Sequence, residues 1–111
     1  ASADLAGGAV KVVRHLLWRG AQDAAPGALG LAGVVLFTEN SMGPPGRAHG
    51  GAVATAFDDA MGQCCVRQLG FLPAWNTVEL SVEYLRATPL SKPLIIAARV
   101  SEREGRSART E

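Results

Sequence analysis

The sequence predicts an α+β domain in which an antiparallel sheet wraps around one long central helix. Residues 51–69 contain no proline and are rich in alanine and other small apolar residues, which is typical of a helix packed closely against a sheet. Apolar segments of strand length flank this helix, each bounded by Gly, Pro or Asn. The 111 residues fit one domain, for which we expect a peripheral helix and linker over residues 1–29 and the core over residues 30–111.

The first half of the chain predicts a helix, a strand and a second helix. Apolar residues recur at near-helical spacing in residues 1–20, which predicts a short amphipathic helix followed by a linker rich in Ala, Gly and Pro. Residues 31–39 are apolar and partly β-branched, which predicts a strand that the sequence NSMGPPGR ends. The helix over 51–69 is apolar nearly all round, so we expect it to be buried, with Gly70 and Pro73 ending it.

The second half predicts consecutive strands. In residues 75–87, Val78, Leu80, Val82 and Tyr84 alternate with polar side chains, the period of a half-buried strand. Residues 94–104 predict another strand, Glu104-Gly105 predicts a hairpin turn, and residues 106–111 predict a return strand. Because the return strand is short, we expect one sheet face to be partly uncovered, with roughly two closing strands missing from this chain or supplied by a partner.

Composition excludes several classes of protein. The net charge of +1, with Lys and Arg scattered among acids, does not predict a nucleic-acid partner. No apolar run reaches the ~18 to 20 residues that a membrane-spanning helix needs. Cys64 and Cys65 are neighbours whose side chains diverge on a helix, so we expect no disulfide and a reducing compartment, the cytoplasm or another such as the mitochondrial matrix. His15 has no second ligand at metal spacing, and we expect no metal site.

His49, Gly50 and Gly51 stand immediately before the central helix. Two glycines allow a ligand to approach the backbone closely, and the first N–H groups of a helix have no partner within the helix. Together with the helix dipole they would bind a negative or polarised oxygen. The alternative is a flexible helix start that binds nothing.

Asp58 and Asp59 lie in the middle of the same apolar helix. Neighbouring residues diverge by about 100° around a helix axis, so at most one of the two carboxylates faces a given surface. A carboxylate on a mostly buried helix, near donors for an oxyanion, is a candidate general base or nucleophile. The alternative is a structural aspartate that caps a loop or pairs with an arginine.

The spacing of these groups predicts a dimer. Gly50 and Asp58 are eight positions apart, which corresponds to about 12 Å along a helix, whereas an oxyanion donor and a base that act on one carbonyl must both lie about 3 Å from it. One helix cannot present both groups to one substrate. If both act, two chains contribute to each site.

The sequence HGGAVATAFDDAMG, followed by TVELSVEYLRATPL and REGRS, resembles the hot-dog-fold acyl-CoA thioesterases of the PaaI-like 4-hydroxybenzoyl-CoA thioesterase superfamily, in particular its THEM4-like branch. The resemblance covers residues 43–111. It implies a hot-dog fold, a homodimer with a continuous sheet that can pair into a homotetramer, and a role in fatty acid metabolism.

The resemblance also implies roles for individual residues. Asp58, nine residues after His49, matches the catalytic acid, and Asp59 does not. Gly50 matches the backbone donor that polarises the thioester carbonyl, and His49 shapes the loop. Thr77 matches the hydroxyl that positions the nucleophilic water. Some relatives carry Asn or Gln in the loop before the histidine; residues 43–47 contain neither, so the carbonyl would depend on backbone donors.

The resemblance implies an acyl-CoA substrate with a medium- or long-chain fatty acyl or aryl group, and no cofactor beyond the CoA of the substrate itself. The candidate substrate-binding residues are Gly51, Asn76, Arg47, Phe57, Met61 and Arg86. Arg47 and Arg86, with Lys92, would meet the CoA phosphates, and ordinary solvated charges are the alternative. Phe57 and Met61, with Trp75, would line an acyl tunnel, and plain core packing is the alternative.

Two other functions are open at this point. A hot-dog hydratase or dehydratase would abstract a proton with a histidine, for which His49 is the candidate. A non-catalytic acyl-binding protein would have no need for an acid such as Asp58 in an apolar site.

Overall fold

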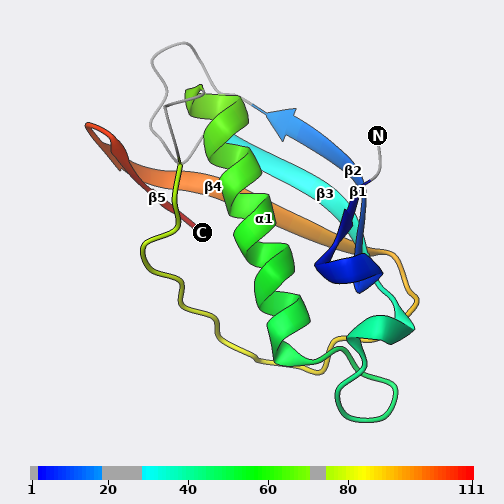
Figure 1. The fold of residues 1–111 in the computed structure, drawn as a ribbon. Helices are drawn as coiled ribbons and strands as arrows, with labels where there is room; N and C mark the ends of the chain where they lie inside the picture. Colours follow the sequence, from blue (N-terminus) through cyan, green and yellow to red (C-terminus); the bar gives the residue numbers. More distant parts are fainter. Residues whose placement is uncertain (1–2, 19–28, 71–74) are drawn as a thin grey trace.

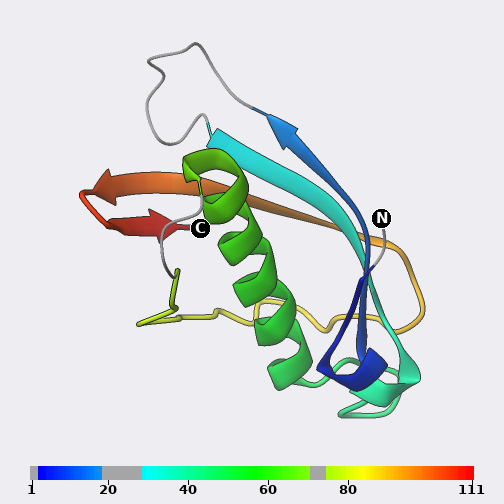
Figure 2. The same ribbon diagram turned by 45° about the horizontal axis from the view of Figure 1, so that its top comes forward.

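The computed structural model describes residues 3–18, 29–70 and 75–111, and it contains one long helix packed on a five-stranded antiparallel sheet. The strands follow one another across the sheet in the order β1-β2-β3-β4-β5 (Figure 1). The elements are β1 (Ala3–Leu5), η1 (Ala6–Gly8), β2 (Val10–Trp18), β3 (Leu29–Phe37), η3 (Glu39–Ser41), α1 (Gly50–Leu69), β4 (Leu94–Glu104) and β5 (Ser107–Thr110). The predicted α+β arrangement of an antiparallel sheet around one central helix is confirmed; Figure 2 shows the sheet curving around α1.

The strands β3 and β4 form the centre of the sheet, and both were predicted. Along β4, Ile96, Ala98 and Val100 are buried whereas Ile95 is 84% exposed, so the strand alternates between the helix side and the outer face. Leu31 pairs with Ala98 in the register between β3 and β4 and is fully buried. The predicted hairpin is also present, because Gly105, at φ 58°, connects β4 to β5.

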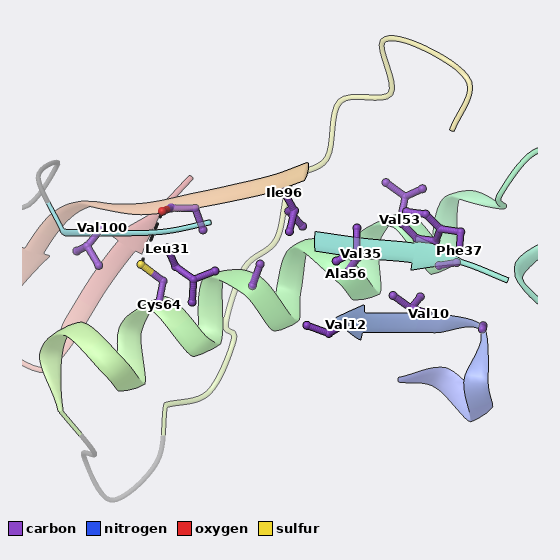
Figure 3. Close-up of a cluster of buried hydrophobic side chains, with 14 residues drawn as sticks. Val10, Val12, Leu31, Val35, Phe37, Val53, Ala56, Cys64, Ile96 and Val100 are labelled. Carbon is purple, nitrogen blue, oxygen red and sulfur yellow. Dashed lines mark hydrogen bonds between the residues drawn. The ribbon is translucent and has the colours of Figure 1, made fainter. Parts of the chain in front are cut away.

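One face of α1 packs on the sheet. Its buried face includes Ala52, Ala56 and Ala60, whose small side chains let the helix lie close to the strands (Ala56 is labelled in Figure 3). The expectation that α1 is buried all round is wrong, since Phe57 on another face is 38% exposed. The sheet covers only one side of the helix, so the remaining side is open for a groove. Gly70, at φ 89°, ends the helix as predicted.

The N-terminal region corrects one prediction. Residues 1–20 were expected to form a peripheral amphipathic helix, but β1 and β2 lie there, and β2 pairs with β3 along its whole length. Val10 and Val12 are buried in the core while Lys11 between them is exposed, which is a strand period. Tertiary pairing with β3 therefore overrode a weak helical spacing. The expected linker falls mainly on residues 19–28, outside the described residues.

Residues 75–87 correct a second prediction. The alternating pattern predicted a half-buried strand, but this segment contains no strand, and Val78 is 97% exposed. A strand forms only where a neighbour accepts its backbone hydrogen bonds. No described strand pairs with this segment, because α1 lies on one side of it and a groove separates it from β5.

The two cysteines are buried and free, in agreement with the expectation of no disulfide. The Cys64 thiol lies 3.9 Å from the Ala98 carbonyl oxygen and 3.6 Å from that of Leu29 (the first contact is drawn in Figure 3). Burial is the main cause, and the neighbouring Cys65 the second, that raises the pKa of the Cys64 thiol from 9.0 to about 11. Cys64 is therefore a neutral core side chain rather than a nucleophile.

Candidate functional site

A groove with a volume of about 720 Å³ runs along the side of α1 that the sheet leaves open. The helix, the extended segment 75–83 and the end of β5 form its walls. Apolar side chains of α1 stand beside polar ones of the segment, so the groove can accommodate a molecule with an apolar part and a polar part. Its lining includes Phe57, Asp58, Met61, Trp75, Asn76, Thr77 and Arg109.

Asp58 and Thr77 meet in this groove. The Thr77 hydroxyl donates a hydrogen bond of 2.6 Å to Oδ1 of Asp58, across 19 positions of sequence. The distance is that of a charge-assisted bond between a hydroxyl and a carboxylate. Asp58 is half-buried and lines the groove. Asp59, one position later on the helix, does not line the groove.

The start of α1 is held by the loop that precedes it. His49 is the N-cap, and its Nδ1 accepts a hydrogen bond of 3.0 Å from the Ala52 N–H. The His49 N–H donates to the carbonyl of Ser41, which is fully buried, at 2.7 Å. A Cβ at Gly43 would lie 2.8 Å from the Cβ of His49, so only glycine fits there. The loop therefore fixes where the first turn of α1 points.

The first turn presents two backbone donors that have no acceptor among the described residues. Gly50 and Gly51 are the first two helical residues, and no hydrogen bond from their N–H groups occurs within the described part of the chain. Both residues are exposed. The His49 side chain satisfies the third N–H, so the two glycine donors remain for a ligand oxygen.

Tyr84 also contacts this turn, although no sequence pattern indicates it as a residue of the site. Its hydroxyl donates to the Gly50 carbonyl at 2.7 Å. A Cβ added at Gly50 would lie 3.2 Å from both Cζ and Oη of Tyr84, so the ring lies directly over the glycine. The alternating pattern placed Tyr84 on the apolar face of a predicted half-buried strand, and no sequence signal links it to Gly50.

The other candidate binding residues divide into two groups. Phe57, Met61 and Asn76 line the groove, as does Trp75, whose Nε1–H donates to the Gly70 carbonyl at 2.9 Å. The three basic candidates are exposed and do not line it: Arg47, Arg86 and Lys92. Arg109 of β5 is a basic residue that does line the groove and was not predicted.

The two halves of the site are separated within one chain. Gly50 and Asp58 lie on the same straight element eight residues apart, or about 12 Å along its axis. Thr77 accompanies Asp58, and Tyr84 accompanies Gly50. Each chain therefore carries Asp58, which we name the carboxylate half, and the helix start at Gly50, which we name the carbonyl-binding half after its proposed role, and the two cannot reach the same atom.

Residues 45–111 match the family model of the thioesterase superfamily, 4HBT. The chain belongs to this superfamily. The curled antiparallel sheet around one helix is the hot-dog fold that the sequence resemblance implied. The chain is also similar to acyl-coenzyme A thioesterase THEM4 of Xenopus laevis, with 38% identity over 68 residues, or 61% of this chain. It spans 29% of the length of that relative.

Two further observations bear on this member of the thioesterase superfamily. No helix among the described residues is long and apolar enough to cross a membrane. Within the same residues, His, Cys, Asp and Glu side chains form no group of three that could hold a metal ion.

Proposed function

We propose that this chain hydrolyses acyl-CoA thioesters. Membership of the thioesterase superfamily and the similarity to a THEM4 acyl-coenzyme A thioesterase support the reaction class. The observation that carries the proposal is the 2.6 Å hydrogen bond from Thr77 to Asp58 in a groove beside apolar side chains. A carboxylate whose orientation is fixed by a hydroxyl, next to room for an acyl group, can act as a general base or a nucleophile.

In this mechanism Asp58 either takes a proton from water or attacks the thioester carbonyl itself, and Thr77 orients the carboxylate and the water. Charge develops on the carbonyl oxygen, where the Gly50 N–H stabilises it with the support of the helix dipole. CoA leaves as a thiolate that takes up a proton: in the general-base route this is the proton that Asp58 removed from water, and in the nucleophilic route water then hydrolyses the acyl–Asp58 anhydride and regenerates the carboxylate. Phe57 and Met61 offer apolar contacts to the acyl group, and Arg109, which lines the groove, is a candidate partner for a CoA phosphate together with Arg47, Arg86 and Lys92.

The complete site requires a second copy of the chain. Because Gly50 and Asp58 of one chain lie about 12 Å apart, we propose that the carboxylate half of one chain faces the carbonyl-binding half of another. A two-fold homodimer would contain two such sites. The buried free thiols Cys64 and Cys65 fit a reducing compartment, the cytoplasm or the mitochondrial matrix.

The reaction is tested by steady-state release of CoA, detected with a thiol reagent, for short, medium and long acyl-CoAs and for an aryl-CoA. Asp58→Asn keeps the shape of the side chain and removes the base, and we expect turnover to fall by at least about 100-fold. Asp59→Asn is the matched control on the adjacent position and should keep most activity. If wild-type protein releases no CoA, or if Asp58→Asn is fully active, the proposal is wrong and a non-catalytic acyl-binding protein or a hydratase becomes the better hypothesis.

The shared site is tested by mixing two inactive chains. Gly50→Pro removes the N–H donor at a backbone position that suits proline, the first helical position after an extended His49 at φ −73° and ψ 156°, although its Cβ, like that of alanine, would lie 3.2 Å from the Tyr84 ring. Gly50→Ala is its control, since it adds a Cβ and keeps the donor. An isolated heterodimer of Gly50→Pro and Asp58→Asn chains contains one intact site and should regain about half of the wild-type turnover. No recovery would contradict a site made by two chains.

A further inference from the structure

Tyr84 makes a contact that core packing does not explain. The side chain is 56% exposed, yet its hydroxyl forms a 2.7 Å hydrogen bond to the Gly50 carbonyl. The chain next to it is held at the same end of α1, because the Ala48 N–H donates to the Thr88 carbonyl at 2.9 Å and Arg47 pairs with Pro89. The approach of the tyrosine to the first turn is therefore fixed by backbone bonds on its C-terminal side.

The acceptor of this bond has a particular place in the site. The carbonyl of Gly50 and the N–H of Gly51 belong to the same planar peptide group, so fixing the oxygen fixes the direction of the N–H. A hydrogen bond accepted by the oxygen also polarises the peptide and strengthens its N–H as a donor. That N–H has no acceptor within the described part of the chain, and it lies at the end of α1 beside the Gly50 N–H.

The absence of a side chain at Gly50 permits this arrangement. A Cβ there would come within 3.2 Å of the phenol carbon and oxygen of Tyr84, closer than ordinary contacts. The glycine thus admits the tyrosine to one side of the turn, while its N–H and that of Gly51 remain open on the end of the helix.

We propose that Tyr84 is a positioning residue for the carbonyl-binding half of the site. Its hydroxyl orients and polarises the Gly50–Gly51 peptide, so that the Gly51 N–H acts with the Gly50 N–H on the thioester carbonyl oxygen. This role rests on the proposed thioesterase function. It assigns a second backbone donor and explains why the one tyrosine of the chain lies over the first helical turn.

The proposal predicts how Tyr84→Phe changes catalysis. The variant keeps the ring and loses the hydroxyl bond, and we expect kcat to fall about fivefold, the middle of the range of about twofold to tenfold for one net hydrogen bond, while KM changes less than about twofold. Ser101→Ala is the matched control, because the Ser101 hydroxyl also donates to a backbone carbonyl, that of Arg109, at 3.2 Å and away from the glycine turn. Its kcat should equal that of the wild type.

A spectroscopic readout separates positioning from general damage. In an Asp58→Asn background, which slows turnover, the infrared stretch of a ¹³C-labelled thioester carbonyl reports its polarisation. We expect binding to lower the stretch frequency of the carbonyl. Tyr84→Phe should make this lowering smaller, and Ser101→Ala should leave it unchanged. If the Tyr84→Phe protein retains both kcat and the carbonyl shift, or loses kcat with the shift intact, the role of Tyr84 is wrong and the thioesterase stands. If wild-type protein releases no CoA, the thioesterase and the role of Tyr84 are both overturned.

Discussion

The bond between Thr77 and Asp58 gives the sharpest quantitative prediction for the reaction. Thr77→Val replaces the hydroxyl by a methyl group of similar size, so it removes the 2.6 Å bond without creating a cavity. A hydrogen bond to a charged group contributes about 1.5 to 3 kcal/mol, and because Thr77 is exposed we take the lower end, about 1.5 kcal/mol. Since about 1.4 kcal/mol corresponds to a tenfold change in rate, kcat/KM should fall about tenfold.

The assay is CoA release with the acyl-CoA that the wild type hydrolyses fastest, and the matched control is Thr77→Ser, which keeps the hydroxyl and loses the methyl group. We expect the serine variant to stay within about twofold of the wild type, since the donor to Asp58 is preserved. The reasoning is refuted if the valine variant is as active as the wild type. It is also refuted if serine is as harmful as valine, because the methyl group rather than the hydroxyl would then matter. Thermal unfolding of all three proteins verifies that they are folded.

Three further predictions concern stability and thiol chemistry. Gly43→Ala should lower the free energy of unfolding by about 1 to 3 kcal/mol in urea denaturation, because its Cβ would lie 2.8 Å from that of His49; unchanged stability would show that the loop yields freely. Gly62→Ala should raise it by up to about 1 kcal/mol, since the position is helical and a Cβ there meets nothing within 4 Å; a loss would contradict this. Cys64 should resist alkylation at pH 8 in the folded protein and react on unfolding; rapid labelling of the native protein would contradict this. Because folding raises the pKa of Cys64 from 9.0 to about 11, the free energy of unfolding should fall as the pH rises from about 9 to about 11, and a stability that does not change over this pH range would contradict the expectation.

Sequence patterns predicted the elements whose residues carry their own signal. The helix was expected over residues 51–69 and is Gly50–Leu69, and the strand expected over 31–39 is Leu29–Phe37. In both cases a long apolar stretch ends at glycine, proline or asparagine, so local chemistry and tertiary packing agree. The hairpin at Gly105 follows the same logic, because a positive φ is needed at the turn and glycine supplies it.

The N-terminal strands could not be predicted from spacing alone. Residues 10–18 have apolar side chains that satisfy a helical and a strand period about equally, and the choice depends on β3, which pairs with Val10 through Trp18. Strand propensity is largely a property of the neighbours that a strand packs against. A sequence pattern for one segment contains no information about those neighbours.

The strand predicted over residues 75–87 is wrong for the opposite reason: its pattern is clear, but no described strand pairs with it. Two tethers fix this segment to α1: Thr77 to Asp58, and Tyr84 to Gly50. Seven residues of regular strand would extend about 23 Å, whereas the two helix positions are about 12 Å apart. The side chains would have to span the difference of about 11 Å for both bonds to form, so the two tethers disfavour a regular strand in one chain.

The candidate site was predictable in its residue types and not in its contacts. The spacing of nine residues from His49 to Asp58 and the glycines at the helix start are local features that the sequence displays directly. By contrast, which of the two adjacent aspartates faces the groove depends on the angle of the helix relative to Thr77, 19 positions away. The bond from Tyr84 to Gly50 spans 34 positions and follows from no local pattern.

The bonds from Thr77 to Asp58 and from Tyr84 to Gly50 are of the same kind. In each, a hydroxyl of segment 75–88 donates to an oxygen of α1, once to the carboxylate proposed as the base and once to the carbonyl next to the proposed donors. Hydroxyls can orient an acceptor without adding charge, so they fix geometry at small electrostatic cost. Because both come from one segment, a change that displaces it should impair the carboxylate half and the carbonyl-binding half together. The single-hydroxyl variants Thr77→Val and Tyr84→Phe, by contrast, should each impair only one half.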